Sequence, residues 1–437
     1  MMDNHIVERI YASYLKSWKV TTDSRSIEPG CLFFALKGNS FDGNAFVGEA
    51  LAQGAVLCVT SDKKYEEREG CVVVDDVLRT LQKVARHHTD HLHVPVIGIT
   101  GTNGKTTTKE LVASVLGKRY KVHATKGNYN NHLGVPLTIL STPKNCEILV
   151  VEMGANHPGE IAELCEIANP GYGLITSVGK AHLEGFGSFD SVVRTKTELY
   201  NHLAKNRGKI FVSTDNEILF REAKERENIG AQLITYGTTL SDVIGTYKGA
   251  DPYMSFYTEI GDNVYNISTK LFGGYNFHNA MAALAVGRYF NVEMYDIKEA
   301  LENYMPDNNR SQIKQTAKNR LFLDCYNANP TSMAAAIEGF ASVADSHKIV
   351  MLGEMKELGV ESSVEHKRLL DNVLSKGFER VILVGAEFEF AKGTRCVEWF
   401  KDSAEAKTYF AEHPIADSSI LIKGSNSNRM ALLEEVL

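Results

Sequence analysis

The stretch VIGITGTNGKTTTKEL, residues 96–111, joins an apolar run to a helix-forming run through a polar loop that contains glycine. A short apolar run that ends at glycine is typical of a buried parallel strand, and the residues from Lys105 onward favour a helix. Glycines let backbone N–H groups surround an anion, and a helix N-terminus adds partial positive charge. The stretch therefore predicts a phosphate-binding loop between a strand and a helix.

Two residues give this loop the chemistry of a nucleoside triphosphate site. The ammonium group of Lys105 can reach the β- and γ-phosphates, and the hydroxyl of Thr106 can bind Mg²⁺. A glycine-rich turn without chemical use is the alternative, which the order of strand, loop, Lys-Thr and helix disfavours. The common pattern G-x-x-x-x-G-K-[ST] needs glycine at position 99, where this chain has Ile99. The compact loop TGTNGKT thus differs from that of most kinases and GTPases.

Composition excludes several classes of protein. A chain of 437 residues predicts about two to four domains. The net charge of −7 argues against a nucleic-acid binder, which usually has a basic excess. Seven scattered cysteines indicate free thiols in a reducing cytoplasm. The first residues carry no apolar signal core, and no run approaches the ~18 apolar residues of a membrane span. We expect a cytoplasmic protein.

Apolar, strand-like runs alternate with helical patterns in three regions, which predicts an α/β fold of three domains. Residues 1–90 read as a small α/β domain. Residues 91–307 contain the runs VPVIGIT, CEILVVEMG and GYGLITSVG, which predict a mostly parallel central sheet, followed by a strand-rich insertion. Residues 308–437 contain four more apolar runs, in RLFLD, KIVMLG, RVILVG and SILIKG, which predict a second open, Rossmann-like sheet.

Four histidines lie at the predicted junction of the first two domains, in ARHHTDHLHVP, residues 85–95. A metal site is one interpretation of this cluster. No acid or cysteine is spaced to complete the ligand set, so a polar linker that Pro95 ends is the better interpretation.

Two polar residues follow predicted strands of the central sheet. Glu152 ends the apolar run EILVVE, so its carboxylate should lie beside the phosphate loop, where it can bind Mg²⁺. A lone glutamate at a strand end is more often solvated, but its position beside a phosphate loop favours the metal role. His182 follows the next strand at the same edge, and by itself it reads as a polar loop residue.

Two further residues lie on predicted helices. By residue type alone, Lys196 in SVVRTKTELY is a solvated helix lysine, because an ammonium group repels Mg²⁺. Asn276 opens the helix in YNFHNA. Its amide offers the donor and acceptor that an adenine edge needs, and its alternative role is to cap the helix N-terminus.

A series of motifs accompanies the compact phosphate loop, and together they resemble the Mur ligase family. The motifs are TDSRSIEPGCLFFALKGNSFDGNAF, KGNYNNHLGVPLT, VVEMGANHPGEI, SVGKAHLEGFGS, RTKTELY, YNFHNAMAALAV, NNRSQ, DCYNANPTSM, GEMKELG and LIKGSNS. Members of this family join amino acids or peptides to a carboxylate at the expense of ATP. The resemblance spans all three predicted domains. YNANP with GEMKELG is most similar to the member that adds D-alanyl-D-alanine to UDP-N-acetylmuramoyl-tripeptide.

The resemblance implies a site for ATP and two Mg²⁺ ions. His182 becomes a ligand of the second Mg²⁺, and Lys196 is carbamylated by CO₂, which turns a cation into an anion able to hold that ion. Arg310 meets the terminal phosphates and Asp324 the ribose hydroxyls, so the third domain must close on the second. The expected catalytic residues are Lys105, Glu152, His182 and Lys196; the nucleotide-binding residues are Thr102, Asn103, Gly104, Lys105, Thr106, Thr107, Asn276, Arg310 and Asp324; the metal-binding residues are Thr106, Glu152, His182 and Lys196.

The resemblance also implies substrate-binding residues. The first-domain motif is similar to the UDP-binding motif of the muramoyl-peptide ligases. Cys325 stands where this branch of the family often has serine, so no hydroxyl is available at that position. The candidates for the nucleotide sugar are Ser24, Arg25, Lys37 and Asp42, and those for the peptide tail or the incoming dipeptide are Asn131, Asn327, Asn329, His366, Lys423 and Ser425.

The implied reaction transfers the γ-phosphoryl group to a carboxylate, and the amine of D-alanyl-D-alanine then displaces phosphate from the acyl phosphate. No serine or cysteine nucleophile is required. The alternatives are a family ligase that adds a single amino acid to a muramoyl or folate substrate, an ATP-binding relative without activity, and a kinase. The motifs YNANP and GEMKELG disfavour the single-amino-acid ligase. The presence of Glu152, His182 and Lys196 disfavours an inactive relative, and Ile99 disfavours a kinase. We expect a monomer, and the third residue of the peptide substrate, diaminopimelate or lysine, is left open.

Overall fold

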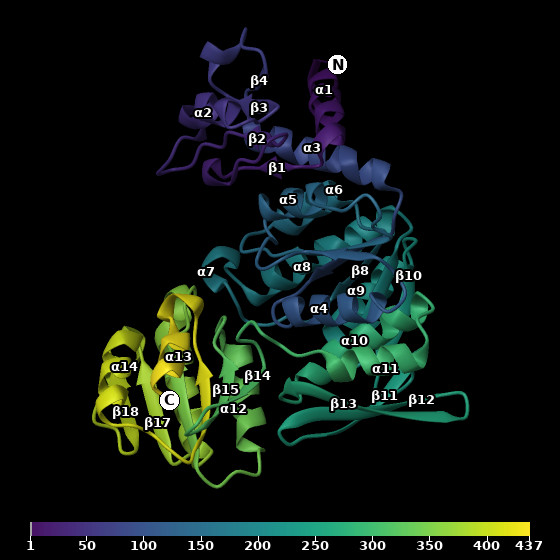
Figure 1. Cartoon of the computed structure of the whole chain (residues 1–437). Helices are drawn as coiled ribbons and strands as arrows, with labels where there is room; N and C mark the ends of the chain where they lie inside the picture. Colours follow the sequence, from purple (N-terminus) through teal and green to yellow (C-terminus); the bar gives the residue numbers. More distant parts are fainter. Residues whose placement is uncertain (1) are drawn as a thin grey trace.

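The computed structural model describes residues 2–437 and contains three α/β units in chain order, each with its own sheet (Figure 1). The expected three-part α/β fold, with a mostly parallel central sheet, is confirmed. In the described part of the chain, none of the helices combines the length and apolar character that crossing a membrane requires.

The first unit is a small parallel sheet whose apolar strands are buried between helices. Leu32 to Phe34 are all buried, and Ile10 and Tyr14 on the first helix pack into the core beneath the sheet. The sheet order is β1-β2-β3-β4, and its last three strands lie in the apolar runs CLFFAL, AVLCVT and CVVVDD. The elements are α1 (Met2–Ser17), β1 (Val20–Thr21), β2 (Leu32–Phe34), α2 (Val47–Ala52), β3 (Leu57–Thr60), β4 (Cys71–Val73) and α3 (Val77–Leu92).

The predicted linker at residues 85–95 is wrong, because α3 continues through the histidines to Leu92 and ends at His93 in a left-handed conformation. The helix persists because one face of it is needed in the core. His88 is buried there, with its ring nitrogens 3.1 Å and 3.3 Å from the hydroxyls of Tyr11 and Tyr14. Burial lowers the pKa of His88 to about 4. Among residues 2–437, no three or more His, Cys, Asp or Glu side chains are grouped to hold a metal ion.

The central unit is a nine-stranded sheet of order β13-β12-β11-β10-β9-β8-β5-β7-β6. It is parallel from β6 to β11, and the strand-rich insertion adds the antiparallel strands β12 and β13. Helices α4, α10 and α11 cover one face, and α5, α6 and α8 cover the other. The strands are β5 (Val96–Thr100), β6 (Val122–Ala124), β7 (Ile148–Glu152), β8 (Tyr172–Ile175), β9 (Lys209–Ser213), β10 (Gln232–Gly237), β11 (Val243–Ala250), β12 (Tyr253–Ile260) and β13 (Asn263–Phe272); the helices are α4 (Lys105–Leu116), α5 (Gly134–Leu140), α6 (Glu160–Ala168), α7 (Leu183–Phe186), α8 (Phe189–Lys205), α9 (Glu217–Glu227), α10 (Asn276–Tyr289) and α11 (Met294–Asn303).

The third unit is a six-stranded sheet of order β14-β15-β19-β16-β17-β18, parallel except for β14. The four predicted strands are present as β15, β16, β17 and β19. The short edge strands β14 and β18, in QIKQ and VEWF, were not predicted because they lack a continuous apolar run. The elements are β14 (Gln312–Gln315), β15 (Arg320–Asp324), α12 (Pro330–Ala341), β16 (Lys348–Gly353), α13 (Ser362–Ser375), β17 (Arg380–Val384), β18 (Val397–Phe400), α14 (Ser403–Glu412) and β19 (Ser419–Lys423).

Candidate active site

A cavity of about 780 Å³ lies between the central and third units. The carboxyl ends of β5, β7 and β8 line it from the central sheet, and those of β15 and β19 line it from the third sheet. Ligands of open α/β sheets bind at this end of the strands. The predicted site residues that line the cavity are Thr102, Asn103, Gly104, Lys105, Thr106, Thr107, Asn131, Glu152, His182, Asn276, Arg310, Asp324, Asn327 and Lys423.

The phosphate loop occupies the predicted turn between β5 and α4. Gly101 and Gly104 both have positive φ, +141° and +82°, which residues with a side chain rarely adopt. A Cβ atom on Gly104 would lie 2.5 Å from Oδ1 of Asn279, so a side chain here would also have to displace that amide. Gly104 is the N-cap of α4, and the helix N-terminus therefore opens into the cavity beside the loop.

Lys105 lies over its own loop. Its Nζ donates to the carbonyl oxygens of Gly101 at 2.7 Å and Thr102 at 3.0 Å, and no carboxylate among residues 2–437 forms an ion pair with it. Burial lowers the pKa of Lys105 to about 8. The negative charge of Glu152 acts in the opposite direction and raises this pKa, whereas the positive charge of Arg310 lowers it further. Phosphate oxygens would be stronger acceptors for this ammonium group than the two neutral carbonyls.

Glu152 is buried at the end of β7, as predicted, with one carboxylate oxygen engaged and the other unpartnered. Its Oε1 accepts a hydrogen bond from Nδ2 of Asn130 at 2.7 Å. Its Oε2 is buried and has no hydrogen-bond partner in the described part of the chain. An unpartnered buried carboxylate oxygen is costly to keep, and a bound cation would satisfy it. The donor set at this strand end therefore fits Mg²⁺.

Lys196 is buried on α8, not solvated as its residue type alone would suggest. Its Nζ donates to the carbonyl oxygen of Ala155, at 3.2 Å and as its one acceptor within residues 2–437, and lies 5.3 Å from the centre of the Phe186 ring. Burial lowers the pKa of Lys196 to about 7, and the positive charge of Lys105 contributes to this lowering. A buried amine held by one neutral acceptor is a costly place for a cation.

His182 lies in the loop between β8 and α7, with a positive φ of 51°. Its Nδ1 faces the carboxylate of Glu357, which belongs to the GEMKELG loop of the third unit. Burial lowers the pKa of His182, and the neighbouring Glu357 raises it. The structure thus brings a predicted metal ligand of the central unit into contact with an acid of the third unit.

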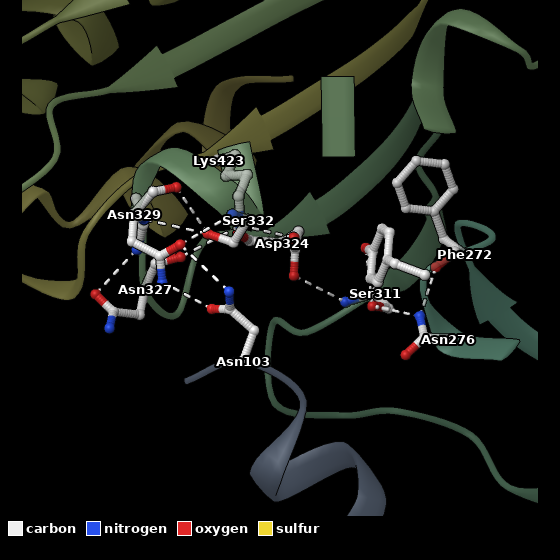
Figure 2. Close-up of polar contacts among 11 residues, drawn as sticks. Asn103, Phe272, Asn276, Ser311, Asp324, Asn327, Asn329, Ser332 and Lys423 are labelled. Carbon is white, nitrogen blue, oxygen red and sulfur yellow. Dashed lines mark hydrogen bonds and ion pairs between the residues drawn. The ribbon is translucent and has the colours of Figure 1, made fainter. Parts of the chain in front are cut away.

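Asn276 and Asp324, predicted to bind adenine and ribose, are both tied to Ser311 in the connection between the units (Figure 2). Asn276 donates to the carbonyl oxygen of Phe272 at 2.7 Å and to Oγ of Ser311 at 2.9 Å, so both amide hydrogens are used within the protein. The alternative role of Asn276 as a helix cap is wrong, because Tyr275 occupies the cap position of α10. The adenine role remains a prediction. It requires Asn276 to give up its hydrogen bonds to Phe272 or Ser311 and to form bonds to the base instead.

Arg310 lies at the start of the third unit and lines the cavity. Its guanidinium carbon is 3.6 Å from the centre of the Tyr326 ring, and its buried Nε has no hydrogen-bond partner among the residues that the structure describes. The ring fixes the plane of the guanidinium group, and the free N–H can donate a hydrogen bond to an anion.

The phosphate loop contacts the third unit through a reciprocal pair of amides (Figure 2). Asn329 Nδ2 donates to Oδ1 of Asn103 at 2.7 Å, and Asn103 Nδ2 donates to Oδ1 of Asn329 at 3.3 Å. Asn329 is also the N-cap of α12, in a capping box with Ser332. Asn329, predicted to bind substrate, therefore joins the two units in this structure.

Other predicted substrate residues of the third unit are engaged within that unit. Lys423 forms a buried ion pair with Asp324 at 2.7 Å. His366 does not line the cavity: its Nε2 accepts from the backbone N–H of Met355 at 3.0 Å, and Nδ1 lies 2.7 Å from the carbonyl oxygen of Ser362. Ser425 is likewise buried and donates to the carbonyl oxygen of Glu354.

Asn131 and Asn327 line the cavity with local roles of their own. Oδ1 of Asn131 accepts from the backbone N–H of Gly134 at 2.9 Å, at the start of α5. Oδ1 of Asn327 accepts from the backbone N–H of Ala328 at 2.9 Å.

The four predicted residues of the first unit lie outside this cavity. Arg25 is exposed and pairs with Asp23 at 2.8 Å, beside Ser24 in a short 3₁₀ helix. Lys37 and Asp42 face each other across an isolated β-bridge, and Oδ1 of Asp42 accepts from the backbone N–H of Asn44 at 2.9 Å.

Asn130, Asn279 and Glu357 are among the cavity residues that were not predicted. Asn130 directly precedes Asn131 in KGNYNN, and Asn279 lies one helical turn after Asn276, so their positions carried a signal. Glu357 had no local signal, because its partner His182 lies in a distant segment of the chain.

Comparison with known proteins agrees with this arrangement. Family descriptions match "Mur ligase family, catalytic domain" at residues 19–99, "Mur ligase middle domain" at 99–287 and "Mur ligase, glutamate ligase domain" at 309–426. The chain is 37% identical to the UDP-N-acetylmuramoyl-tripeptide–D-alanyl-D-alanine ligase of Bacillus subtilis over 84% of this chain and 79% of that protein. It is similar to the crystal structure of MurF from Acinetobacter baumannii (TM-score 0.87, 30% identity, covering 96% and 93% of the two chains). It is also similar to MurF ligase from Thermotoga maritima in complex with ADP (TM-score 0.85, 28% identity, covering 97% of each chain).

Proposed function

Because the chain belongs to the Mur ligase family, we propose that it is an ATP-dependent ligase that joins D-alanyl-D-alanine to UDP-N-acetylmuramoyl-tripeptide in peptidoglycan precursor synthesis. The observation that carries the proposal is the cavity that holds both the phosphate loop and the strand ends of the third unit. Relatives and structural neighbours with that named activity support the choice of substrates.

The proposed reaction activates a carboxylate, which is otherwise a poor electrophile because its leaving group would be oxide. Transfer of the γ-phosphoryl group of ATP to the tripeptide carboxylate gives an acyl phosphate and ADP. The amine of D-alanyl-D-alanine attacks the acyl carbon, loses a proton, and displaces phosphate to form the amide. The reacting groups belong to the substrates, so the protein has to position them and stabilise charge.

The residues of the cavity suit these two tasks. The N-terminus of α4 and Lys105 bind the terminal phosphates and offset the charge of the group in transfer. Arg310 supplies a further cation from the third unit, and its free Nε–H is available to a phosphate oxygen. Docking of the third unit then encloses the reacting groups and excludes water.

The metal-binding part of the proposal assigns Thr106 and Glu152 to one Mg²⁺ and His182 with Lys196 to a second. Its support is the unpartnered Oε2 of Glu152 and the position of Thr106 at the start of α4. When bound, Mg²⁺ neutralises charge on the phosphate oxygens. The neutral amine of Lys196 is the form that reacts with CO₂, and its burial beside a single carbonyl acceptor supports carbamylation.

We also propose that one chain in the cytoplasm is sufficient, because Lys105, Glu152 and Arg310, the groups that the proposed reaction uses, meet in one cavity within a single chain. Light scattering of the active enzyme tests this, with a single mass of about one chain as the expected result. The proposal would be contradicted if the active enzyme had a larger mass and if dilution reduced both that mass and the activity.

Phosphate release from ATP tests the function directly. Release should require both UDP-N-acetylmuramoyl-tripeptide and D-alanyl-D-alanine, and mass spectrometry should show the tripeptide product extended by the dipeptide. Diaminopimelate- and lysine-containing tripeptides should be compared, to determine the third residue that the enzyme accepts. Release with a single amino acid or with folate in place of the dipeptide and tripeptide would refute the proposal.

A further inference from the structure

A second contact between the central and third units lies in the β8–α7 loop, which carries His182. Nζ of Lys180 in this loop is 2.9 Å from Oε1 of Glu365 on α13. Glu365 is 6% exposed, whereas about two-fifths of the Lys180 side chain is exposed. The same carboxylate oxygen also accepts from Nη1 of Arg368 within the third unit at 2.9 Å.

The surrounding contacts hold the same loop against the third unit. The backbone N–H of Glu184 donates to the carbonyl oxygen of Glu357 at 3.4 Å, and the side chain of Glu357 faces His182. Gly359 follows in the GEMKELG loop with a φ of +53°, and a Cβ atom there would lie 3.7 Å from Cα of Glu184. The loop from 180 to 184 is therefore held at three points by one loop and one helix of the third unit.

His182 needs such support because its own backbone does not hold it in a preferred conformation. Both His182 and Glu357 have positive φ, 51° and 62°, which non-glycine residues adopt at a cost. Strained residues persist where the surrounding structure determines their conformation. Part of that surrounding structure here belongs to the third unit, so the position of His182 depends on docking.

We propose that Lys180 and Glu365 are positioning residues, whose ion pair docks the third unit on the β8–α7 loop and thereby holds His182 in place for the reaction. The consequence for catalysis depends on the proposed function, whereas the docking itself does not. Neither residue lines the cavity, so their substitution changes docking without removing a group that faces the substrates.

Charge reversal provides the test. Lys180→Glu places a second carboxylate against buried Glu365 and should repel the third unit. Hydrogen exchange measured by mass spectrometry should then be faster in the peptides that cover residues 178–187 and 355–366, by about tenfold, in the absence of any substrate. Lys180→Glu combined with Glu365→Lys restores an attractive pair and should return exchange to within about threefold of wild type.

Glu365 is buried, so the double reversal places a lysine in a buried position and can impair folding. A second double variant avoids this problem. Lys180→Glu with Glu365→Gln removes the repulsion without adding a buried cation, and it should recover at least part of the protection. Arg368→Glu is the matched control: it changes the other partner of Glu365, which lies within the third unit, and should leave exchange at 178–187 unchanged.

Steady-state kinetics then tests the positioning role. In Lys180→Glu the value of kcat should fall about tenfold. In the double variants, kcat should recover to the same extent as the protection from hydrogen exchange. Unchanged exchange in Lys180→Glu would overturn the docking role. Faster exchange with unchanged kcat would overturn the positioning of His182. Wild-type protein without dipeptide ligase activity would refute the proposed function instead, and the exchange experiment would still decide the docking role.

Discussion

The carboxyl edges of the central and third sheets face one cavity, but their polar residues are used differently. At the central edge, as residues 2–437 show it, Oε2 of Glu152 has no partner, and the hydrogen bonds of Lys105 and Lys196 go to neutral carbonyl groups. At the third edge, Lys423 pairs with Asp324. Groups left unsatisfied at a buried site cost stability, so their retention indicates a ligand, whereas satisfied groups are explained by the fold. The comparison predicts chemistry at the central edge and positioning at the third edge, except at Arg310, whose unpartnered buried Nε is the group that the third unit offers to a ligand.

The largest effect should follow from loss of Lys105. Lys105→Ala removes the cation that we propose contacts the transferred group, and kcat should fall about 1,000-fold because such a contact is strongest in the transition state. The thermal midpoint should change little, since the hydrogen bonds of this side chain within residues 2–437 go to its own loop. Steady-state kinetics with a thermal melt measures both, and near-normal kcat in a folded variant would contradict the role.

The second effect distinguishes an anion from a cation at position 196. Lys196→Ala should lose about 100-fold in kcat, and added formate should restore part of it by supplying a small carboxylate in the vacated space. Lys196→Arg should remain inactive with formate, because it keeps a positive charge and fills that space. A simple helix lysine would instead leave both variants active.

Mass spectrometry of the intact native protein provides a second measurement for this residue. The active enzyme should carry the added mass of CO₂, and Lys196→Ala should not. An active Lys196→Arg enzyme, or a fully active wild type with an unmodified amine, would rule out the carbamate.

The difference between the two edges also explains what could be predicted from the sequence. The phosphate loop and Glu152 were predictable because strand, loop and helix are consecutive, and the carboxyl ends of parallel strands share one edge. His366 and Ser425 have residue types that suit substrate binding, but their partners come from other segments of the third unit. The contact between Asn103 and Asn329 spans 226 positions, and residue type alone could not indicate it. Likewise, the histidines of α3 read as a linker because their burial against α1 depends on tertiary packing.

A smaller effect should come from the amide pair that connects the two edges. Asn103→Asp and Asn329→Asp each leave one amide able to donate to a carboxylate, and the carboxylate that Asn329→Asp introduces can still cap α12. The double Asp variant places two carboxylates together, so its loss of docking should exceed the sum of the single losses. Small-angle scattering without nucleotide measures docking and avoids the effect of Asn103 on ATP binding. Additive changes would show that the two amides act independently.

The smallest effect on activity should come from His366, which tests the third edge as a structural region. His366→Gln keeps an acceptor for the backbone N–H of Met355, so kcat should stay within about threefold of wild type. A loss much larger than this in a folded variant would instead support the predicted substrate role.

The stability of the same variant has a pH dependence of known sign. Burial lowers the pKa of His366 below 6.5, so the unfolded chain binds the proton more readily than the native protein. The stability that neutral His366 contributes is therefore complete above about pH 6.5 and decreases as the pH falls toward the native pKa. His366→Gln should lower the thermal midpoint at about pH 7.5 and lower it less at about pH 5.5, because glutamine does not titrate. An equal drop at both pH values would show that burial does not hold His366 neutral, and would contradict the proton linkage assigned to it here.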